Sequence, residues 1–204
     1  MSARPIRLAF LASHRGSSMR AIVAAAAAGE LAVEPVLVAS NNADAAALDF
    51  ARQAGLPAVH ISATRAGGAE AADVALRDAL QAAGAEWVAL SGYMRKLGPA
   101  VLAAYPGRIL NVHPALLPKH GGEGLYGRRV HQAVLAAGET VSGPTIHLVD
   151  EEYDRGPILA QAEVPVRPDD TAESLEARVV AREPALYIEV LKRIVAGELP
   201  RLVR

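Results

Sequence analysis

Asn111 and His113, two positions apart, are the strongest candidates for chemistry in this sequence. They end the run 108–113, which predicts a strand, and side chains two apart on a strand point to the same face. The run continues into Pro114-Ala115-Leu116-Leu117-Pro118, where two prolines fix the direction of the backbone. An amide donor stabilises developing negative charge, and an imidazole moves protons.

A third candidate is an aspartate of the acidic turn 150–157, which lies between two runs that alternate like strands. A carboxylate beside an imidazole favours the charged ring and raises its pKa. These three residue types could form one site for a reaction with an anionic intermediate. The residues alone leave a structural interpretation open, because strand-end histidines are often structural and acidic turns are often solvated.

The elements that must position these residues begin with an alternation of strands and helices. Strands are predicted at residues 6–12, 36–40, 58–62 and 87–90, and helices at 19–28, from caps at 41–44 to 54, and at 70–83. Apolar runs separated by helices of ten or more residues indicate βαβ units and a parallel sheet. Ligands of such sheets bind outside the carboxyl ends of the strands.

The second half differs, with a strand at 108–113, a glycine-rich loop at 114–127 and a helix at 128–137. The runs 141–149 and 158–166 predict antiparallel strands, and a last helix is predicted at 171–196, with Thr171 as its cap. The predicted fold class is α/β, a Rossmann-like, mostly parallel sheet flanked by helices with antiparallel strands in the C-terminal half. We expect a single domain, 1–204, with halves 1–107 and 108–204.

Composition excludes several classes of function. The chain has 204 residues, 51% of them apolar and 21% charged, and a net charge of −1, so neither nucleic acid nor a membrane is expected as a partner. The absence of cysteine excludes disulfides, thiolate catalysis and cysteine-type zinc sites, and is compatible with the cytoplasm. No metal site is expected, because the remaining histidines are scattered: His14, His60, His120, His131 and His147.

Four segments together resemble the folate-dependent formyltransferases. They are Ser-Gly-Tyr-Met-Arg-Lys-Leu at 91–97, the run 109–119, Ser-Gly-Pro-Thr-Ile-His-Leu-Val at 142–149, and the turn 150–157. Glu183, within residues 181–187, extends the match into the last helix, so the resemblance covers nearly the whole chain. Its most specific part is N-x-H-P-x-L-L-P followed by D-x-G-x-I.

The resemblance implies a reaction and a catalytic centre. The donor would be 10-formyltetrahydrofolate, a co-substrate, and the acceptor the amine of glycinamide ribonucleotide, with no metal required. Asn111 would hydrogen-bond the oxyanion of the tetrahedral intermediate. His113, kept protonated by Asp154, would stabilise that oxyanion and assist proton transfer.

The resemblance also implies where each substrate binds. The turn after the first strand precedes a helix N-terminus, where free N–H groups favour a phosphate, although an ordinary strand-to-helix connection has the same composition. The ribonucleotide residues would be His14, Arg15, Gly16, Ser17, Ser18 and Glu183, the last holding the ribose hydroxyls. The folate residues would be Met94, Arg95, Lys96, Leu97, Asn111, Asp150, Glu151, Glu152, Tyr153 and Asp154.

The sequence departs from the family in three places. The turn with His14 and Arg15 is poorer in glycine and asparagine than usual. The loop 120–127 is longer than the common form, and its glycines suggest a mobile lid over the site. An arginine of many members falls at Ala69, which leaves open whether Arg15 or Arg65 replaces such contacts. The sequence also leaves open whether the protein is a monomer or a homodimer.

Three alternatives remain for comparison. Methionyl-tRNA formyltransferase and formyltetrahydrofolate hydrolase carry an additional domain, which a chain of this extent is not expected to have. A nucleotide-dependent oxidoreductase would fit the βαβ start, but the first strand is not followed by G-x-G-x-x-G. A non-catalytic binding protein would not require the three polar positions.

Overall fold

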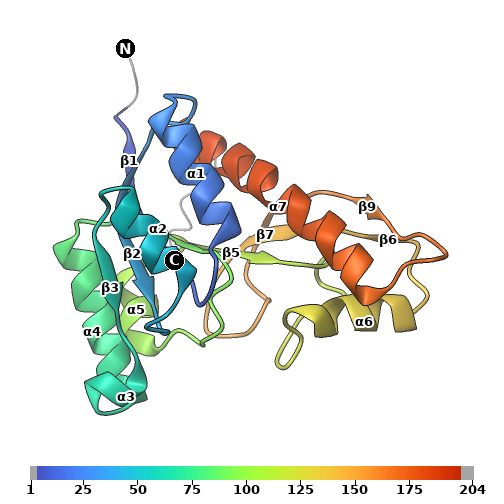
Figure 1. Ribbon diagram of the computed structural model, residues 1–204, viewed down its shortest axis with the longest axis horizontal. Coiled ribbons are helices and arrows are strands. Elements are labelled where there is room, and N and C mark those ends of the chain that lie inside the picture. Colours follow the sequence, from blue (N-terminus) through green and yellow to red (C-terminus); the bar gives the residue numbers. More distant parts are fainter. Residues whose placement is uncertain (1–3, 199–204) are drawn as a thin grey trace.

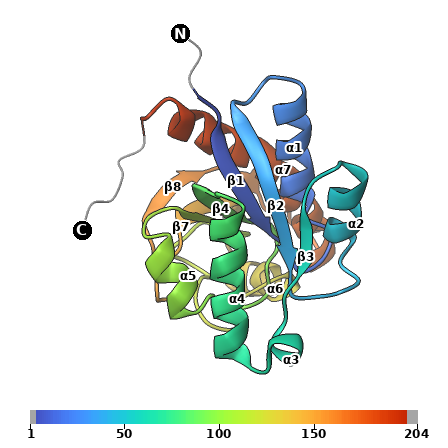
Figure 2. The same ribbon diagram turned by 90° about the vertical axis from the view of Figure 1, so that its left-hand side faces the viewer.

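The computed structural model describes residues 4–198, and its centre is a seven-stranded sheet (Figures 1 and 2). Its strands are β1 (Ile6–Leu11), β2 (Val33–Ser40), β3 (Ala58–His60), β4 (Trp87–Leu90), β5 (Ile109–His113), β7 (Thr145–Leu148) and β8 (Ile158–Gln161). Their order across the sheet is β3-β2-β1-β4-β5-β7-β8. Strands β1 to β5 run parallel to one another, whereas β7 is antiparallel to β5 and β8. The predicted fold class is confirmed.

The sheet is continuous between the two predicted halves, because β4 and β5 pair directly with each other. The predicted domain runs from residue 1 to residue 204, and residues 1–3 and 199–204 lie outside the described range.

The two long strands predicted at 141–149 and 158–166 are each two short strands. β6 (Val141–Ser142) pairs with β9 (Val164–Pro165) in a separate two-stranded sheet, while β7 and β8 extend the main sheet. Gly143, which follows β6, has a φ of 142°, and a Cβ there would collide with the carbonyl oxygen of Ala162. The predicted antiparallel pairing is confirmed. The prediction that each strand is continuous is wrong, because the two segments approach closely where they pass from one sheet to the other.

Helices cover both faces of the main sheet. They are α1 (Ser17–Ala27), α2 (Ala46–Gln53), α3 (Ala63–Ala66), α4 (Ala69–Ala82), α5 (Pro99–Ala104), α6 (Arg128–Ala136) and α7 (Ala172–Val195). Leu8 and Phe10 of β1 pack in one core with α1, α2 and α7, whereas Ala9 and Leu11 face a second core with α4 and α5. The short helices α3 and α5 have no counterpart among the predicted elements.

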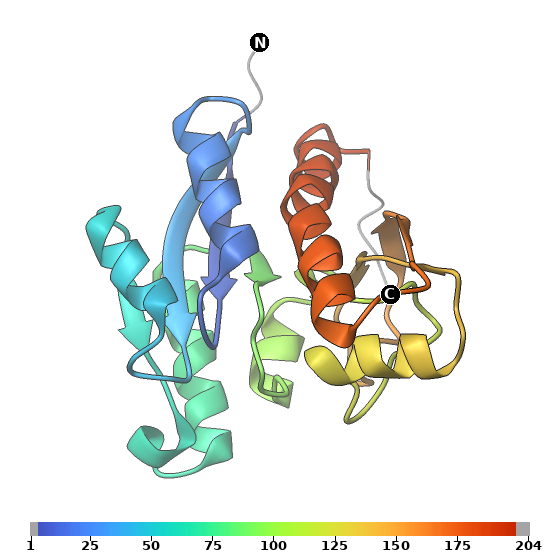
Figure 3. The same cartoon turned by 45° about the vertical axis from the view of Figure 1, so that its right-hand side comes forward.

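The longest helix, α7, packs against the main sheet and lines the cleft described below. Thr171 caps it as predicted: its hydroxyl accepts from the N–H of Ser174, and the Ser174 hydroxyl accepts from the N–H of Thr171. Near this end, α7 packs against α6 through Val130, Val134 and Val179. Figure 3 shows α6 beside this end of α7, with α1 beside its other end.

Among residues 4–198, the helices include none with both the length and the apolar character that a bilayer crossing requires.

Candidate active site

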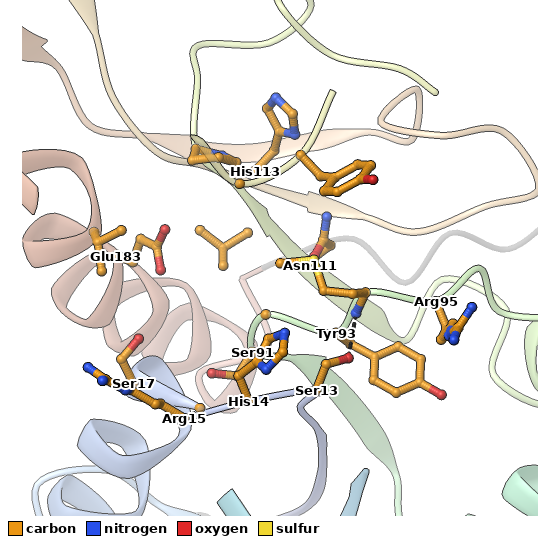
Figure 4. Close-up of a pocket in the computed structure, with 18 of the residues that line it drawn as sticks. Ser13, His14, Arg15, Ser17, Ser91, Tyr93, Arg95, Asn111, His113 and Glu183 are labelled. Atoms are coloured by element: carbon orange, nitrogen blue, oxygen red, sulfur yellow. Dashed lines mark hydrogen bonds between the residues drawn. The ribbon is translucent and has the colours of Figure 1, made fainter. Parts of the chain in front are cut away.

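A cleft of about 1220 Å³ opens at the carboxyl ends of β1, β2, β4 and β5. Its walls come from residues 13–17 after β1, 41–46 after β2, 91–95 after β4, and 111–114 with 122–127, together with side chains of α6 and α7. Ligands of open parallel sheets bind at this edge. The cleft is therefore the candidate active site (Figure 4).

A second, smaller cavity of about 80 Å³ adjoins the cleft, between residues 93–97 and the turn 149–154. Both cavities are lined by Tyr93, Arg95, Asn111, Tyr153 and Asp154. Two small molecules bound in the two spaces would thus meet at a common wall that contains Asn111 and Asp154.

β5 carries Asn111 and His113 to the cleft, as the alternation of side chains along the strand predicts (Figure 4). The strand pairs with β7, so that Asn111 lies opposite His147 and His113 opposite Thr145. The Thr145 hydroxyl donates to the carbonyl of Ala115 at 2.6 Å and accepts from the N–H of Leu117 at 3.1 Å. These bonds fix the chain that leaves His113.

His113 is held between two acceptors. Its Nδ1 lies 3.3 Å from Oδ2 of Asp154, and its Nε2 donates to the carbonyl oxygen of His120 at 2.8 Å. The structure thus brings Asn111, His113 and Asp154 together. Only 4% of the His113 side chain is exposed, and this burial lowers the pKa of the imidazole below its usual value, although Asp154 and the His120 carbonyl act to raise it. The expectation of a raised pKa is wrong, because desolvation of the charged ring outweighs its two favourable partners.

Asp154 is held as a carboxylate. Burial acts to raise its pKa, but the neighbouring His147 imidazole, the charge of His113 and the Gly122 N–H, at 2.9 Å from Oδ2, together lower the pKa below its usual value. Its φ of 56° places the residue in the left-handed region, which Asp tolerates better than most residues. The turn 150–157 is thereby fixed to the glycine-rich loop.

His147 is a functional candidate that the sequence reasoning missed. Its Nδ1 donates to the carbonyl of Leu148 at 2.9 Å, so its Nε2 is free to accept from the Asn111 amide Nδ2 at 3.1 Å. The same Nε2 lies 3.5 Å from Oδ1 of Asp154. His147 therefore orients the amide of Asn111. A polar residue within the buried run of β7 is the signal that could have found it.

The N-terminus of α1 forms the wall where the ribonucleotide phosphate was expected. Gly16 precedes α1 with a φ of 62°, and no side chain caps the helix. Ser91 accepts from the N–H of Met19 at 3.1 Å, deeper in the first turn. Of the predicted residues, His14, Arg15, Gly16 and Ser17 line the cleft, whereas the buried Ser18 does not and contacts Glu183 instead.

Glu183 reaches the cleft from α7, as Figure 4 shows. Its carboxyl oxygen lies 3.4 Å from the Ser18 hydroxyl, and the residue is only 9% exposed. Burial raises the pKa of the Glu183 carboxyl to about 7, with a further rise from the charge of Glu176 and an opposing effect of the Ser18 hydroxyl. A surface carboxylate is thus excluded. A buried carboxyl with one weak partner is suited to accept hydrogen bonds from ligand hydroxyls.

The predicted folate residues all lie along the two cavities. Met94 lines the cleft, where the hydroxyl of Ser13 accepts from its N–H at 2.7 Å. Lys96 lies over the ring of Tyr153, 5.2 Å from its centroid. Residues lining the small cavity are Arg95, Lys96, Leu97, Asn111, Asp150, Glu151, Glu152, Tyr153 and Asp154.

Further residues of the cleft were not predicted, among them Asn41, Tyr126, Arg129 and His131. Arg15 lines the cleft, but Arg65 is on α3 and lies outside its lining. Within residues 4–198, no three or more His, Asp and Glu side chains are grouped so that they could hold a metal ion.

An amide donor and a carboxylate on the wall between two cavities, with an imidazole beside the carboxylate, form the arrangement expected of an enzyme that transfers a group between two small molecules. Residues 6–191 match the formyl transferase family model. The chain therefore belongs to the formyl transferase family.

Individual relatives agree with this assignment. The chain is 43% identical to a chloroplastic phosphoribosylglycinamide formyltransferase of Arabidopsis thaliana, over 92% of this chain and 65% of that protein. It is 37% identical to the phosphoribosylglycinamide formyltransferase of Haemophilus influenzae, over 95% of this chain and 89% of that protein. The chain thus spans just under two thirds of the length of this plant relative and most of the length of the bacterial one.

A solved structure is similar over nearly the same range. Glycinamide ribonucleotide transformylase 1 from Symbiobacterium toebii superposes with a TM-score of 0.91 at 38% identity, covering 97% of this chain and 91% of that one.

Proposed function

We propose that this protein transfers the formyl group of 10-formyltetrahydrofolate to the amine of glycinamide ribonucleotide, a step of purine synthesis. The observation that carries the proposal is that Asn111 and Asp154 line both cavities, with His113 in the cleft beside Asp154. The names of the relatives support this choice of substrates. The proposal includes a location in the cytoplasm, which the lack of cysteine allows.

The reaction begins with attack of the substrate amine on the formyl carbon. A new C–N bond forms, and the formyl oxygen becomes an oxyanion. Asn111 donates to that oxygen from the amide that His147 orients. The charged form of His113, paired with Asp154, stabilises the same oxyanion and is the local source of a proton.

Collapse of the intermediate breaks the bond between the formyl carbon and N10 of the folate. N10 takes up a proton as it leaves, and the attacking amine loses one, so that the number of protons is unchanged. The pair of His113 and Asp154 would supply the one proton and take up the other. The products are formylglycinamide ribonucleotide and tetrahydrofolate.

The remaining walls would hold the two substrates. The N-terminus of α1 offers N–H groups of Gly16, Ser17 and Ser18 to the phosphate, with Arg15 adding charge. Glu183, which lies beside this helix end in contact with Ser18, would accept from the ribose hydroxyls. The small cavity beside residues 94–97 and the turn 150–154 would take the folate ring.

The test follows the absorbance change on deformylation of 10-formyltetrahydrofolate by the purified protein, with and without glycinamide ribonucleotide. Turnover that requires the ribonucleotide is the expected result. Turnover without it would contradict the proposal and identify a hydrolase. No turnover under either condition would also reject it, in favour of a different acceptor or a binding role.

A further inference from the structure

The carbonyl group of His120 has a direct effect on His113. A carbonyl oxygen only accepts hydrogen bonds, so its contact of 2.8 Å with Nε2 requires that this nitrogen carries a hydrogen. When His113 and Asp154 together hold a second proton, that proton lies between Nδ1 and the Asp154 carboxylate, which are 3.3 Å apart. The His120 carbonyl therefore selects one tautomer of neutral His113 and fixes the plane of its ring.

The backbone of His120 needs support to present this carbonyl. Its φ of 55° is uncommon for a residue other than glycine, and such a conformation persists where surrounding contacts impose it. The loop that follows contains Gly121, Gly122 and Gly124, which restrict the backbone little. A contact through the His120 side chain is thus well placed to hold the carbonyl.

Glu139 supplies that contact. Its Oε1 lies 3.2 Å from Nε2 of the His120 imidazole, and their side chains are only 24% and 16% exposed, respectively. Glu139 stands on a fixed part of the backbone, because its N–H bonds to the carbonyl of Val134 and the N–H of Gly138 bonds to that of Leu135 at the end of α6. A helix end therefore anchors the loop.

Glu139 also has a partner that does not act on His113. The ammonium of Lys119 lies 3.1 and 3.2 Å from the two carboxylate oxygens, and its side chain is 69% exposed. Such an exposed ion pair contributes little to stability. Lys119 therefore provides a matched control for the contact with His120.

We propose that Glu139 is a positioning residue for the transfer reaction: by binding the His120 imidazole, it holds the His120 carbonyl on Nε2 of His113 and so fixes the ring that pairs with Asp154. Glu139 lies outside the lining of both cavities and acts through His120 alone. The inference rests on the proposed function only in that formyl transfer is one of its two readouts.

The first measurement is steady-state formyl transfer by Glu139→Ala across a pH series. We expect kcat to fall about tenfold, comparable with the loss of a group that orients a metal-bound imidazole, with both KM values within about twofold. The His120 carbonyl favours the charged form of His113, so its loss lowers the pKa of His113. The alkaline limb of the kcat profile, where charged His113 is lost, should therefore move to lower pH.

Two further variants separate positioning from general damage. Glu139→Gln keeps an acceptor oxygen for His120 and should restore most of kcat, whereas Lys119→Ala should behave like the wild type. Wild-type kcat and pH profile in Glu139→Ala would overturn the proposal. A raised kcat would overturn it too, because it would show that the contact restrains His113. Equal losses in Glu139→Ala and Lys119→Ala would have the same consequence.

The second measurement does not depend on catalysis. Nitrogen-15 NMR of His113, assigned by its absence from His113→Asn, should show the Nε2–H tautomer in the wild type and a mixture of tautomers in Glu139→Ala. An unchanged tautomer would overturn the proposal even if the wild type had no transferase activity. Absence of transfer in the wild type together with the expected change of tautomer would reject the proposed function alone.

Discussion

At the scale of single residues, the centre works through paired acceptors and donors. Both nitrogens of His113 face acceptors, and Asp154 accepts from Gly122 while it faces two histidines. A neutral His113 with its hydrogen on Nε2 would turn a lone pair toward the Asp154 carboxylate. A proton between them relieves this repulsion, so the two residues titrate as a pair, and burial decides how tightly the proton is held.

This pairing predicts that His113→Ala and Asp154→Asn each lower kcat by about 10²–10⁴, because each removes one half of the proton-holding pair. Steady-state transfer assays with circular dichroism to verify folding would measure the effect. Asp49→Asn, at an exposed carboxylate of α2, is the control and should keep full activity. Near-normal turnover in either centre variant would contradict the mechanism.

The raised pKa of Glu183 predicts a trade between stability and binding. Its carboxyl has a pKa of about 7 in the folded state against 4.5 in the unfolded chain, so the folded protein holds the proton more tightly. The wild type should therefore lose stability as pH rises from about 4.5 to 7, by about 3 kcal/mol at most. Glu183→Gln should remove this loss.

Urea unfolding of the wild type and Glu183→Gln near pH 4.5 and near pH 8 would measure this loss of stability. The variant should be more stable than the wild type only at the higher pH, and its KM for the ribonucleotide should rise far more than that for the folate. A stability difference that is the same at both pH values would refute the buried charge, and an unchanged ribonucleotide KM would remove Glu183 from the site.

The sequence predicted a residue of the centre only where the local spacing or the family resemblance identified it. Asn111 and His113 were predictable because the period of a strand puts both on one face, and Asp154 and Glu183 were predictable because of the family resemblance. His147 and His120 were not, because their roles depend on strand register and on a backbone carbonyl. The pKa of His113 was predicted with the wrong sign because burial cannot be read from the spacing of charges.

At the scale of elements, the same contrast between local and non-local information holds. Helices α4 and α7 and the parallel strands follow from hydrophobic periodicity and from caps such as Thr171. The division of residues 141–149 between two sheets does not, because β6 and β7 both alternate as strands should. What separates them is the close approach of Gly143 to Ala162, a contact between residues nineteen positions apart in the chain.

Tyr187 joins α7 to the strands that carry the site. Its buried hydroxyl lies 2.8 Å from the carbonyl of Leu90, at the end of β4, and 3.0 Å from the carbonyl of Leu110, within β5. Tyr187→Phe should lower the free energy of unfolding by about 1–3 kcal/mol, because these carbonyls lose a buried donor.

Denaturant titration with an unchanged m-value would measure the effect of Tyr187→Phe. Tyr126→Phe, at an exposed position (54%) of the glycine-rich loop, is the matched control and should leave stability within about 0.5 kcal/mol. Equal stability of Tyr187→Phe and the wild type would show that the hydroxyl does not connect helix and sheet energetically.

At the scale of the whole molecule, the fold brings two binding spaces to one edge of a single sheet. Residues after β1 and on α7 form one space, and residues after β4 and β7 form the other, with Asn111 on the wall between them. The sites adjoin but do not coincide, which is what direct transfer between two bound substrates requires.

This arrangement predicts additive stabilisation by the two ligands. At about 100 times its Kd, each ligand alone should stabilise the protein by about 2.7 kcal/mol, and glycinamide ribonucleotide with a non-reactive folate analogue should give at least the sum. Thermal melts with each ligand and with both would measure this. Glu183→Ala should lose the ribonucleotide shift and keep the folate shift, because Glu183 lines only the larger cleft. If the two ligands together instead gave little more than the shift of one ligand alone, they would compete for one space, and direct transfer across the Asn111 wall would be impossible.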